Sequence, residues 1–246
     1  MSAINWNATL THCCLASLSL SQALANEEEG RELKHFRGKK LDTKIAVALF
    51  ALVLAGCATL RPTEAEPVRT YLLEAQFDRI VQVKPIPLAL TVSPPRAVPG
   101  YDTVSMVFIR QPHRLEYFAK NRWAESPAKM LSPLLVRALE LRTGFKAVTY
   151  AGGMVKGDVR LDTEITLLQQ EFTTSPSRLH MKLRVQLVEQ ASYRVLATQV
   201  FDAVEAAPTD DPYGGVIAAN RMLPRLLGQI ADFAAMNGVS FSEHRK

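Results

Sequence analysis

The sequence predicts one α+β domain, with two main helices packed on one face of a mixed, largely antiparallel sheet. Residues 158–167 and 179–187 alternate between apolar side chains and charged or polar ones, which gives each strand one apolar face. A third apolar segment, 195–201, follows, and the connections at 175–176 and 191–192 are short. Strands joined in this way form an antiparallel meander whose polar face is in contact with water.

Four shorter strands are predicted ahead of this meander, at 70–75, 88–92, 104–110 and 115–118. The connection between the first two contains Pro85 and Pro87. Prolines within 94–100 then force a loop, because proline has no backbone donor for a sheet ladder. Residues 111–113 form the turn that joins the last two of these strands.

The first helix starts at one of two serine-proline pairs, 126–127 or 132–133. Each pair offers an N-cap followed by proline at the first helical position. Apolar residues up to Leu141 recur at a spacing that buries one face, and Gly144 ends the helix.

The second helix opens at residues 211–212, an aspartate followed by proline, and carries apolar residues as far as Phe233. We expect Pro224 and Gly228 to bend it. With both helices on one side of the sheet, the chain has the layer pattern of an α+β domain.

A possible membrane signal precedes the domain, at Leu54, Ala55, Gly56 and Cys57. The apolar run 45–54 lies behind a basic flank and ends in small residues, which is the pattern of a secretory signal with its cleavage site. The four residues resemble the lipobox of bacterial lipoproteins, which implies cleavage before Cys57 and acylation of this cysteine. Several acyl chains give durable anchoring, whereas one chain binds only reversibly.

Two other interpretations of the run 45–54 are less favoured. A transmembrane helix needs about 18 to 20 apolar residues, and this run is well short of that before Gly56, Thr59 and Arg61. A buried core helix with a chance cysteine does not account for the basic flank or the small residues.

The lipobox divides the chain into a signal peptide at 41–56, a lipidated flexible tether at 57–68 and the folded domain at 69–246. The tether contains prolines and glutamates with few apolar residues, which favours an extended, solvated segment. Residues 1–40 do not fit in front of such a signal. We expect translation to start near Leu41, so that 1–40 are an annotation artefact; otherwise they form a disordered cytoplasmic extension.

Composition excludes several classes of function. The formal net charge is +5 with signs alternating along the chain, which is not the pattern of a nucleic-acid-binding protein. Cleavage before Cys57 would remove Cys13 and Cys14 and leave the one remaining cysteine acylated, so no thiol would be left for a disulfide or a metal. We expect no metal site and no cofactor.

The sequence also lacks the patterns of common catalytic sites. The histidines are scattered, and His113 and His180 are expected on the solvated surface. Asp210 and Asp211 precede a helix, where acidic residues usually favour its positive end. No Gly-x-Ser-x-Gly motif is present, and we expect a protein that is not an enzyme.

A basic cluster with interspersed aromatic residues is the one candidate interaction surface. Its members are Arg110, Arg114, Lys120 and Arg122, with His113 in the turn and Tyr117, Phe118 and Trp123 among them. One interpretation is a surface that meets acidic lipid headgroups or an acidic partner. The other, which we favour from the sequence, is a solvated strand face with its aromatic residues turned to the core.

Together these segments resemble one family. The lipobox, the sequence Tyr71-Leu72-Leu73 after the tether, and residues 109–110 and 115–127 before a leucine-rich helix are similar to the ABC-type transport auxiliary lipoproteins. The similarity covers roughly residues 68–233. It implies a non-catalytic accessory subunit of an MCE-type lipid transport system, beside an ABC permease, an ATPase and a membrane-anchored MCE-domain protein.

The resemblance also bears on location and leaves a second function open. Ala58, rather than aspartate, follows Cys57, which implies anchoring in the periplasmic leaflet of the outer membrane, with the inner membrane as the alternative. The second function is a periplasmic lipid or lipoprotein carrier that encloses an acyl chain between helices and sheet. Homo-oligomerisation is also left open.

Overall fold

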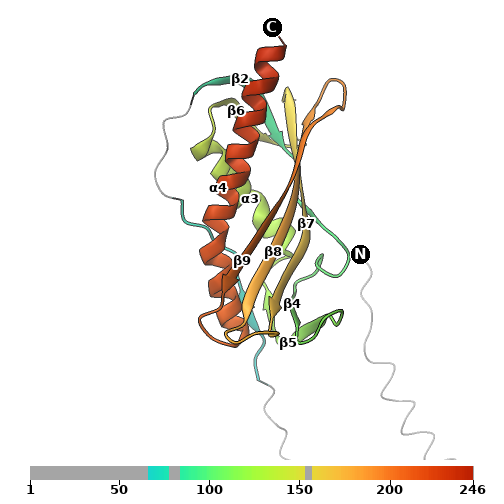
Figure 1. Ribbon diagram of the computed structural model, residues 1–246, viewed down its shortest axis with the longest axis vertical. Coiled ribbons are helices and arrows are strands. Elements are labelled where there is room, and N and C mark those ends of the chain that lie inside the picture. The colour runs from blue at the N-terminus through green and yellow to red at the C-terminus, as the bar shows by residue number, and fades with distance from the viewer. Residues whose placement is uncertain (1–65, 78–83, 153–156, 246) are drawn as a thin grey trace, which may run out of the picture. The chain divides into compact units, whose positions relative to one another are not determined.

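The computed structural model describes residues 66–77, 84–152 and 157–245 (Figure 1). The segments predicted as extension and signal peptide, the lipobox residues Leu54 to Cys57, and the tether up to residue 65 lie outside the described residues.

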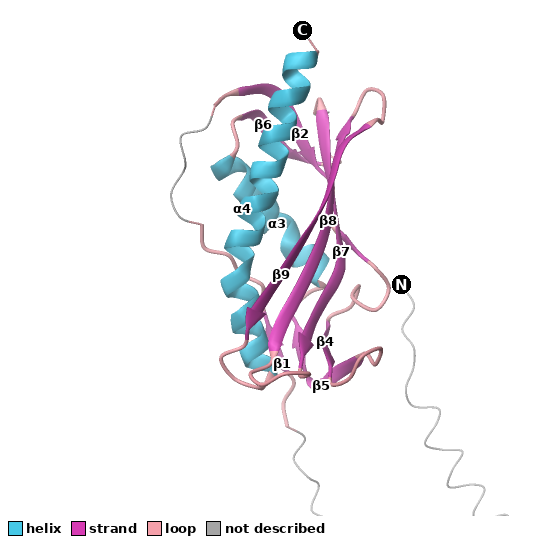
Figure 2. Cartoon of the chain, in the orientation of Figure 1, coloured by secondary structure: helices cyan, strands magenta, loops and turns pink. Residues whose placement is uncertain are grey.

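A mixed sheet forms one layer and two helices form the other (Figure 2). The strands are β1 (Arg69–Tyr71), β2 (Ile86–Val92), β3 (Arg96–Ala97), β4 (Ser105–Ile109), β5 (Glu116–Trp123), β6 (Phe145–Tyr150), β7 (Val159–Glu171), β8 (Arg178–Glu189) and β9 (Val195–Ala206). The helices are α3 (Pro127–Arg142) and α4 (Pro212–His244), and both cover the same face of the sheet. The predicted α+β fold, with one domain and two helices on one face, is confirmed.

Strand β7 organises the sheet because every part of its length is paired. Along one edge it pairs in turn with β2, β3 and β4, all parallel to it. Along the other edge it pairs with β8, which continues antiparallel to β9. The predicted meander is therefore confirmed, and its strands extend beyond the predicted segments. The long ladders are antiparallel, whereas the parallel pairs are short.

Several elements differ from the sequence prediction. The strand expected at 70–75 is limited to β1, because from Leu72 onward the backbone bonds to a side chain of α4 instead of a strand. Strand β6 was not predicted and lies parallel to β2. Strand β3, within the predicted loop 94–100, was also missed; it is two residues long and follows a pair of prolines.

The structure decides between the two predicted starts of the first helix, at 126–127 and at 132–133. Helix α3 begins at Pro127 after Ser126, and Pro133 lies inside the helix. Helix α4 begins after Asp211 and continues through Pro224 to His244. None of the helices in the described part of the chain is long and apolar enough to span a membrane.

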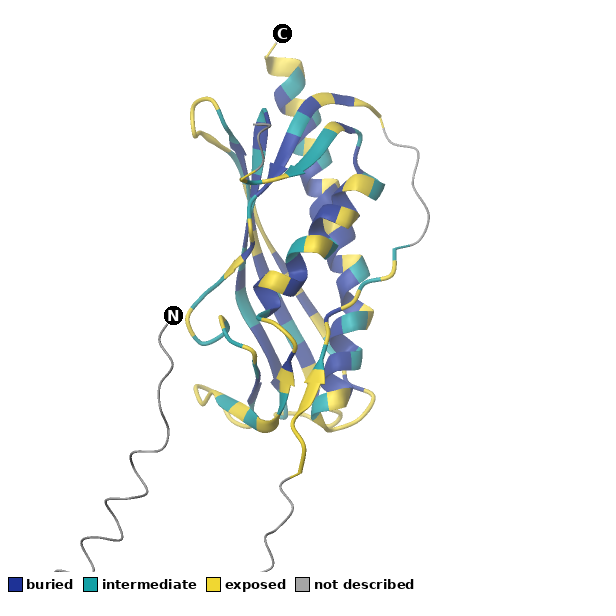
Figure 3. Cartoon of the chain, turned by 180° about the vertical axis from the view of Figure 1, so that it is seen from behind, coloured by how far each residue is buried: buried dark blue, intermediate teal, exposed yellow. Residues whose placement is uncertain are grey.

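The core fills the space between helices and sheet (Figure 3). Phe201 of β9 packs edge-on against Phe233 of α4, with ring centroids 5.8 Å apart. Large side chains that are fully buried come from both layers and include Leu90, Leu131, Leu135, Leu161, Ile165, Met181, Leu183, Met222 and Leu223. Burial of this apolar surface supplies the main driving force for folding.

Candidate functional site

The start of the described chain lies beside β5, the strand that carries much of the basic cluster. Strand β1 is parallel to β5, with Arg69 opposite Asn121. The Tyr71 hydroxyl donates to Asn121 Oδ1 at 3.1 Å, and Lys120 Nζ lies 2.8 Å from Glu66 Oε2. The hydrogen bond from Lys120 and the charge of this lysine lower the pKa of the Glu66 carboxyl. The last residues of the predicted tether therefore pack on the basic strand.

The structure brings the two arginines of the β4–β5 connection together around one carboxylate. Arg110 Nη1 and Arg114 Nε each lie 3.7 Å from Glu116. The Arg110 guanidinium also lies over the ring of Phe108, 5.0 Å from its centroid. These contacts leave both arginine side chains more than half exposed, and such exposed ion pairs add little stability.

The aromatic residues of the cluster divide between core and surface. Trp123 is 3% exposed, and Phe118 packs on Phe108 with centroids 4.3 Å apart. Tyr117 is 47% exposed. The favoured interpretation, with aromatic residues turned to the core, thus describes Phe118 and Trp123 and fails for Tyr117.

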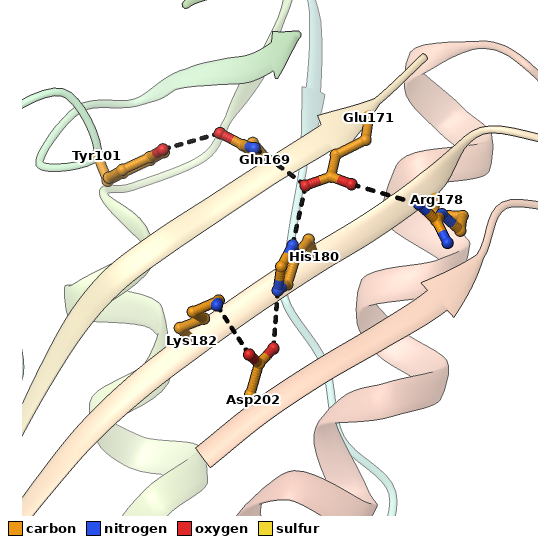
Figure 4. Close-up of polar contacts among 7 residues, drawn as sticks. All are labelled: Tyr101, Gln169, Glu171, Arg178, His180, Lys182 and Asp202. Carbon is orange, nitrogen blue, oxygen red and sulfur yellow. Dashed lines mark hydrogen bonds and ion pairs between the residues drawn. The ribbon is translucent and has the colours of Figure 1, made fainter. Parts of the chain in front are cut away.

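A second polar cluster lies on the face of the meander away from the helices (Figure 4). His180 Nδ1 lies 2.8 Å from Glu171 Oε1, and His180 Nε2 lies 2.7 Å from Asp202 Oδ1. Lys182 Nζ also contacts Asp202, at 2.8 Å. His180 faces outward as predicted, but its side chain is only 17% exposed.

These contacts keep the carboxylates of the second cluster ionised. Partial burial would raise the pKa of Glu171, but hydrogen bonds from His180 and Gln169 outweigh it and the pKa is lowered. The hydrogen bond from Lys182 lowers the pKa of Asp202. Sequence reasoning missed this cluster, because the strand register that places Asp202 beside His180 is not visible in the chain order.

A shallow pocket of about 400 Å³ lies next to β3 on the same sheet and is lined by residues such as Pro94, Arg96 and Arg160. Within it, Arg160 binds Asp162 through two hydrogen bonds of 2.8 and 2.9 Å. Burial raises the pKa of Asp162, but bonds from Arg160 and Ser93 outweigh it and the pKa is lowered. Arg160, Asp162 and Ser93 are thus already paired with one another, whereas the buried Thr163 hydroxyl, which also lines the pocket, has no hydrogen-bond partner among the described residues.

The expected position at the start of a helix gives Asp211 a capping role, whereas Asp210 binds the segment between β7 and β8 instead. Asp211 Oδ1 accepts from the Gly214 backbone nitrogen at 2.7 Å and caps α4. Asp210 accepts from the Ser177 backbone nitrogen, which lowers the pKa of its carboxyl. Among the described residues, no group of three or more histidine, cysteine or acidic side chains is placed to hold a metal ion.

The chain is similar to a known protein family over most of the described domain. A family model described as "ABC-type transport auxiliary lipoprotein component" matches residues 71–231. No curated protein matches the chain.

Two solved structures share the fold. A crystal structure of a Xanthomonas campestris protein, described with the family model DUF330, has a TM-score of 0.66 at 18% identity and covers 72% of this chain and 99% of its own. Another, described as an uncharacterized protein, has a TM-score of 0.54 at 16% identity and covers 68% of this chain and 99% of its own.

Proposed function

This chain belongs to the family of ABC-type transport auxiliary lipoprotein components, and from that premise we propose that it is a non-catalytic docking component of an MCE-type lipid transport system. The family match over residues 71–231 is the observation that carries the proposal, since it covers β2 to β9, helix α3 and the first part of α4, including the strand that carries Lys120 and Arg122. The family description indicates an auxiliary role in transport and no catalytic one.

The proposed mechanism is geometric. Residues 41–56 serve as signal peptide, Cys57 becomes the acylated N-terminus, and residues 57–68 tether the domain at 69–246 to a membrane of the cell envelope. Leu54, Ala55 and Gly56 are the residues recognised by the signal peptidase. A lipid anchor fixes the domain at one bilayer, and a protein interface fixes the periplasmic end of the transporter to it.

The partners of this assembly would be a membrane-anchored MCE-domain protein, the ABC permease and the ATPase. Ala58 after the acylated cysteine supports anchoring in the periplasmic leaflet of the outer membrane. An accessory subunit placed there would align the transporter between the inner and outer membranes.

Cross-linking in cells tests the docking role. The full chain with a photo-reactive residue on an exposed face of the domain should form covalent adducts with an MCE-domain protein, and Cys57→Ser should reduce their yield. If Cys57→Ser forms as many adducts as the unmodified chain, docking does not require the lipid anchor. If adducts lack any subunit of an ABC transporter, the proposed function is wrong.

Extraction of lipid from the purified domain provides a second test. The space between helices and sheet is occupied by fully buried side chains such as Leu135, Leu161 and Met222, which leaves a docking role the better supported one. A stoichiometric acyl lipid recovered from the Cys57→Ser protein would instead support the carrier function.

A further inference from the structure

We propose that the end of the domain formed by β1, β5 and the β4–β5 connection docks on an anionic phospholipid surface. We call this end the basic corner and define it by Arg69, Arg110, Arg114, Lys120 and Arg122. The inference rests on the proposed lipid anchor for its biological setting, because that anchor would bring this corner to a membrane.

The first observation is the direction in which the chain leaves the domain. Strand β1 is parallel to β5, so the residues before Arg69 run back beside β5 toward its first residue. The ion pair between Glu66 and Lys120 shows this path directly. The chain therefore heads toward the β4–β5 connection, which lies at the same end of the domain as β1 (Figure 2). This connection carries Arg110 and Arg114.

The second observation is the length of chain between this corner and Cys57. Glu66 lies nine positions after Cys57, and a fully extended chain spans at most about 3.3 to 3.6 Å per residue. An acylated Cys57 would thus hold the basic corner within roughly 30 Å of the bilayer. Within that distance the corner can reach the headgroups.

The third observation is the balance of charge. Among the described residues, the carboxylates that contact the basic corner are Glu66 and Glu116, and each is already bound by a lysine or by arginines. Five basic side chains against these two carboxylates leave an excess of positive charge. An anionic lipid surface attracts such a cluster, at about five-fold in affinity for each basic residue near it.

The fourth observation is exposed apolar surface on the same elements. Val68, Leu72, Leu115 and Tyr117 are each more than a third exposed, and all four lie on or next to β1 and β5. Basic residues mixed with exposed apolar and aromatic side chains are typical of surfaces that lie at the membrane interface. An acidic protein surface would use the charges but would not by itself account for this apolar component.

Vesicle binding by residues 58–246 tests the proposal. Residues 65–246 form a compact unit whose core lies entirely within it, and the fragment carries no acyl chain. We expect it to bind vesicles of phosphatidylethanolamine with phosphatidylglycerol, and to bind phosphatidylcholine vesicles at least ten-fold more weakly, since about five basic residues contribute. Binding should weaken as salt shortens the screening length from about 10 Å at 0.1 M to about 3 Å at 1 M.

A matched pair of variants locates the surface. Replacing Arg110, Arg114, Lys120 and Arg122 by glutamine should weaken binding to the anionic vesicles by more than roughly ten-fold. The control replaces Lys84, Arg137, Lys146 and Arg184 by glutamine, which removes the same charge from other elements, and should keep most of the binding. Circular dichroism and thermal melting confirm that both variants are folded.

An environment-sensitive fluorophore gives a second measurement that does not depend on removing charge. The fragment has no cysteine, so Leu115→Cys and, as a control, Lys84→Cys allow single labels. On anionic vesicles the label at residue 115 should shift to shorter wavelength and the label at residue 84 should not. Equal binding to both kinds of vesicle, or equal loss in both glutamine variants, overturns the proposal. Neither result depends on acylation, so a failure of the lipid anchor is detected separately.

Discussion

Gln170 connects β7 to the start of α4 through a buried amide. Its Nε2 donates to Ser177 Oγ at 2.9 Å and to the Asp211 backbone oxygen at 3.0 Å. A Cβ added at Gly215 would lie 2.5 Å from Gln170 Oε1, so the two residues fit only because position 215 has no side chain. This contact determines how closely the helix approaches the strand.

Gly215→Ala should therefore destabilise the domain despite the better helix propensity of alanine. Overpacking costs about 1 to 3 kcal/mol, whereas the gain in propensity is at most about 1 kcal/mol. We expect a net loss of about 1 to 2 kcal/mol in the free energy of unfolding, measured by urea denaturation. In a Gln170→Ala background the same substitution should cost less than half as much; an equal cost would show that the contact is not the cause.

Ionised carboxylates make the stability of the domain sensitive to acid. The pKa values of Asp162, Glu171 and Asp202 are lowered in the folded state. Their contribution is fully present above the unfolded pKa values, about 3.9 for Asp and 4.3 for Glu, and is lost as pH falls through the lower folded values.

We thus expect the midpoint of urea unfolding to stay constant between about pH 7 and pH 5 with respect to these groups and to fall below about pH 4. Asp162→Asn should be less stable at neutral pH and lose less on acidification. If the urea midpoint of this variant falls with pH as steeply as that of the unmodified chain, Asp162 does not have this role.

At the scale of elements, α4 holds the segment that follows β1. Asn220 Oδ1 accepts from the Glu74 backbone nitrogen at 3.0 Å, and its Nδ2 donates to the Leu72 backbone oxygen at 3.3 Å. One side chain thus replaces the strand partner that this segment lacks. Tyr213, at the start of α4, also packs near Tyr71, with ring centroids 6.0 Å apart.

Asn220→Ala should loosen this segment while leaving the sheet intact. The loss of two exposed hydrogen bonds is expected to cost about 1 kcal/mol. Hydrogen exchange at the Glu74 amide should accelerate, with little change at amides of β7 and β8. Asn237→Ala is the control, since among the described residues the Asn237 side chain bonds within α4, to the Phe233 backbone oxygen. Unchanged exchange at Glu74 would show that other contacts hold the segment.

The elements that the sequence predicts are those with a pattern in consecutive residues. Strands β7 and β8 and both helices have clear periodicity in consecutive residues, and short turns determine the meander that β9 completes. Strand β6 has no regular alternation of burial and pairs with β2, more than fifty positions earlier. Strand β3 lies between prolines. Parallel pairing between distant segments leaves little trace in local sequence.

The candidate sites also divide into a local sequence pattern and contacts between residues far apart in the sequence. The proposed lipobox at Leu54 to Cys57 is a local motif, so a single pass along the chain finds the pattern. The approach of Glu66 to Lys120 joins residues 54 positions apart, and the bonds of His180 depend on the register of three strands. Such contacts exist only in the folded domain.

At the scale of the whole domain, the basic corner lies far from the C-terminal end of α4. The basic corner and the start of β1 lie at one end, and the C-terminal end of α4 lies at the other (Figure 1). Helix α4 has 33 residues, which corresponds to a length of about 50 Å. A domain docked by its basic corner would therefore present the far end of α4 well away from the membrane, toward its partners in the transport system.

The central claim is that this domain is attached to a membrane through Cys57. Mass spectrometry of the N-terminal peptide of the protein, purified from membranes of cells that express the full chain, tests it most directly. We predict a peptide that begins at Cys57 and carries a diacylglyceryl group with a further acyl chain on its amine. A peptide from residues 1–40 joined to an unmodified Cys57 would contradict both the anchor and the predicted start of translation.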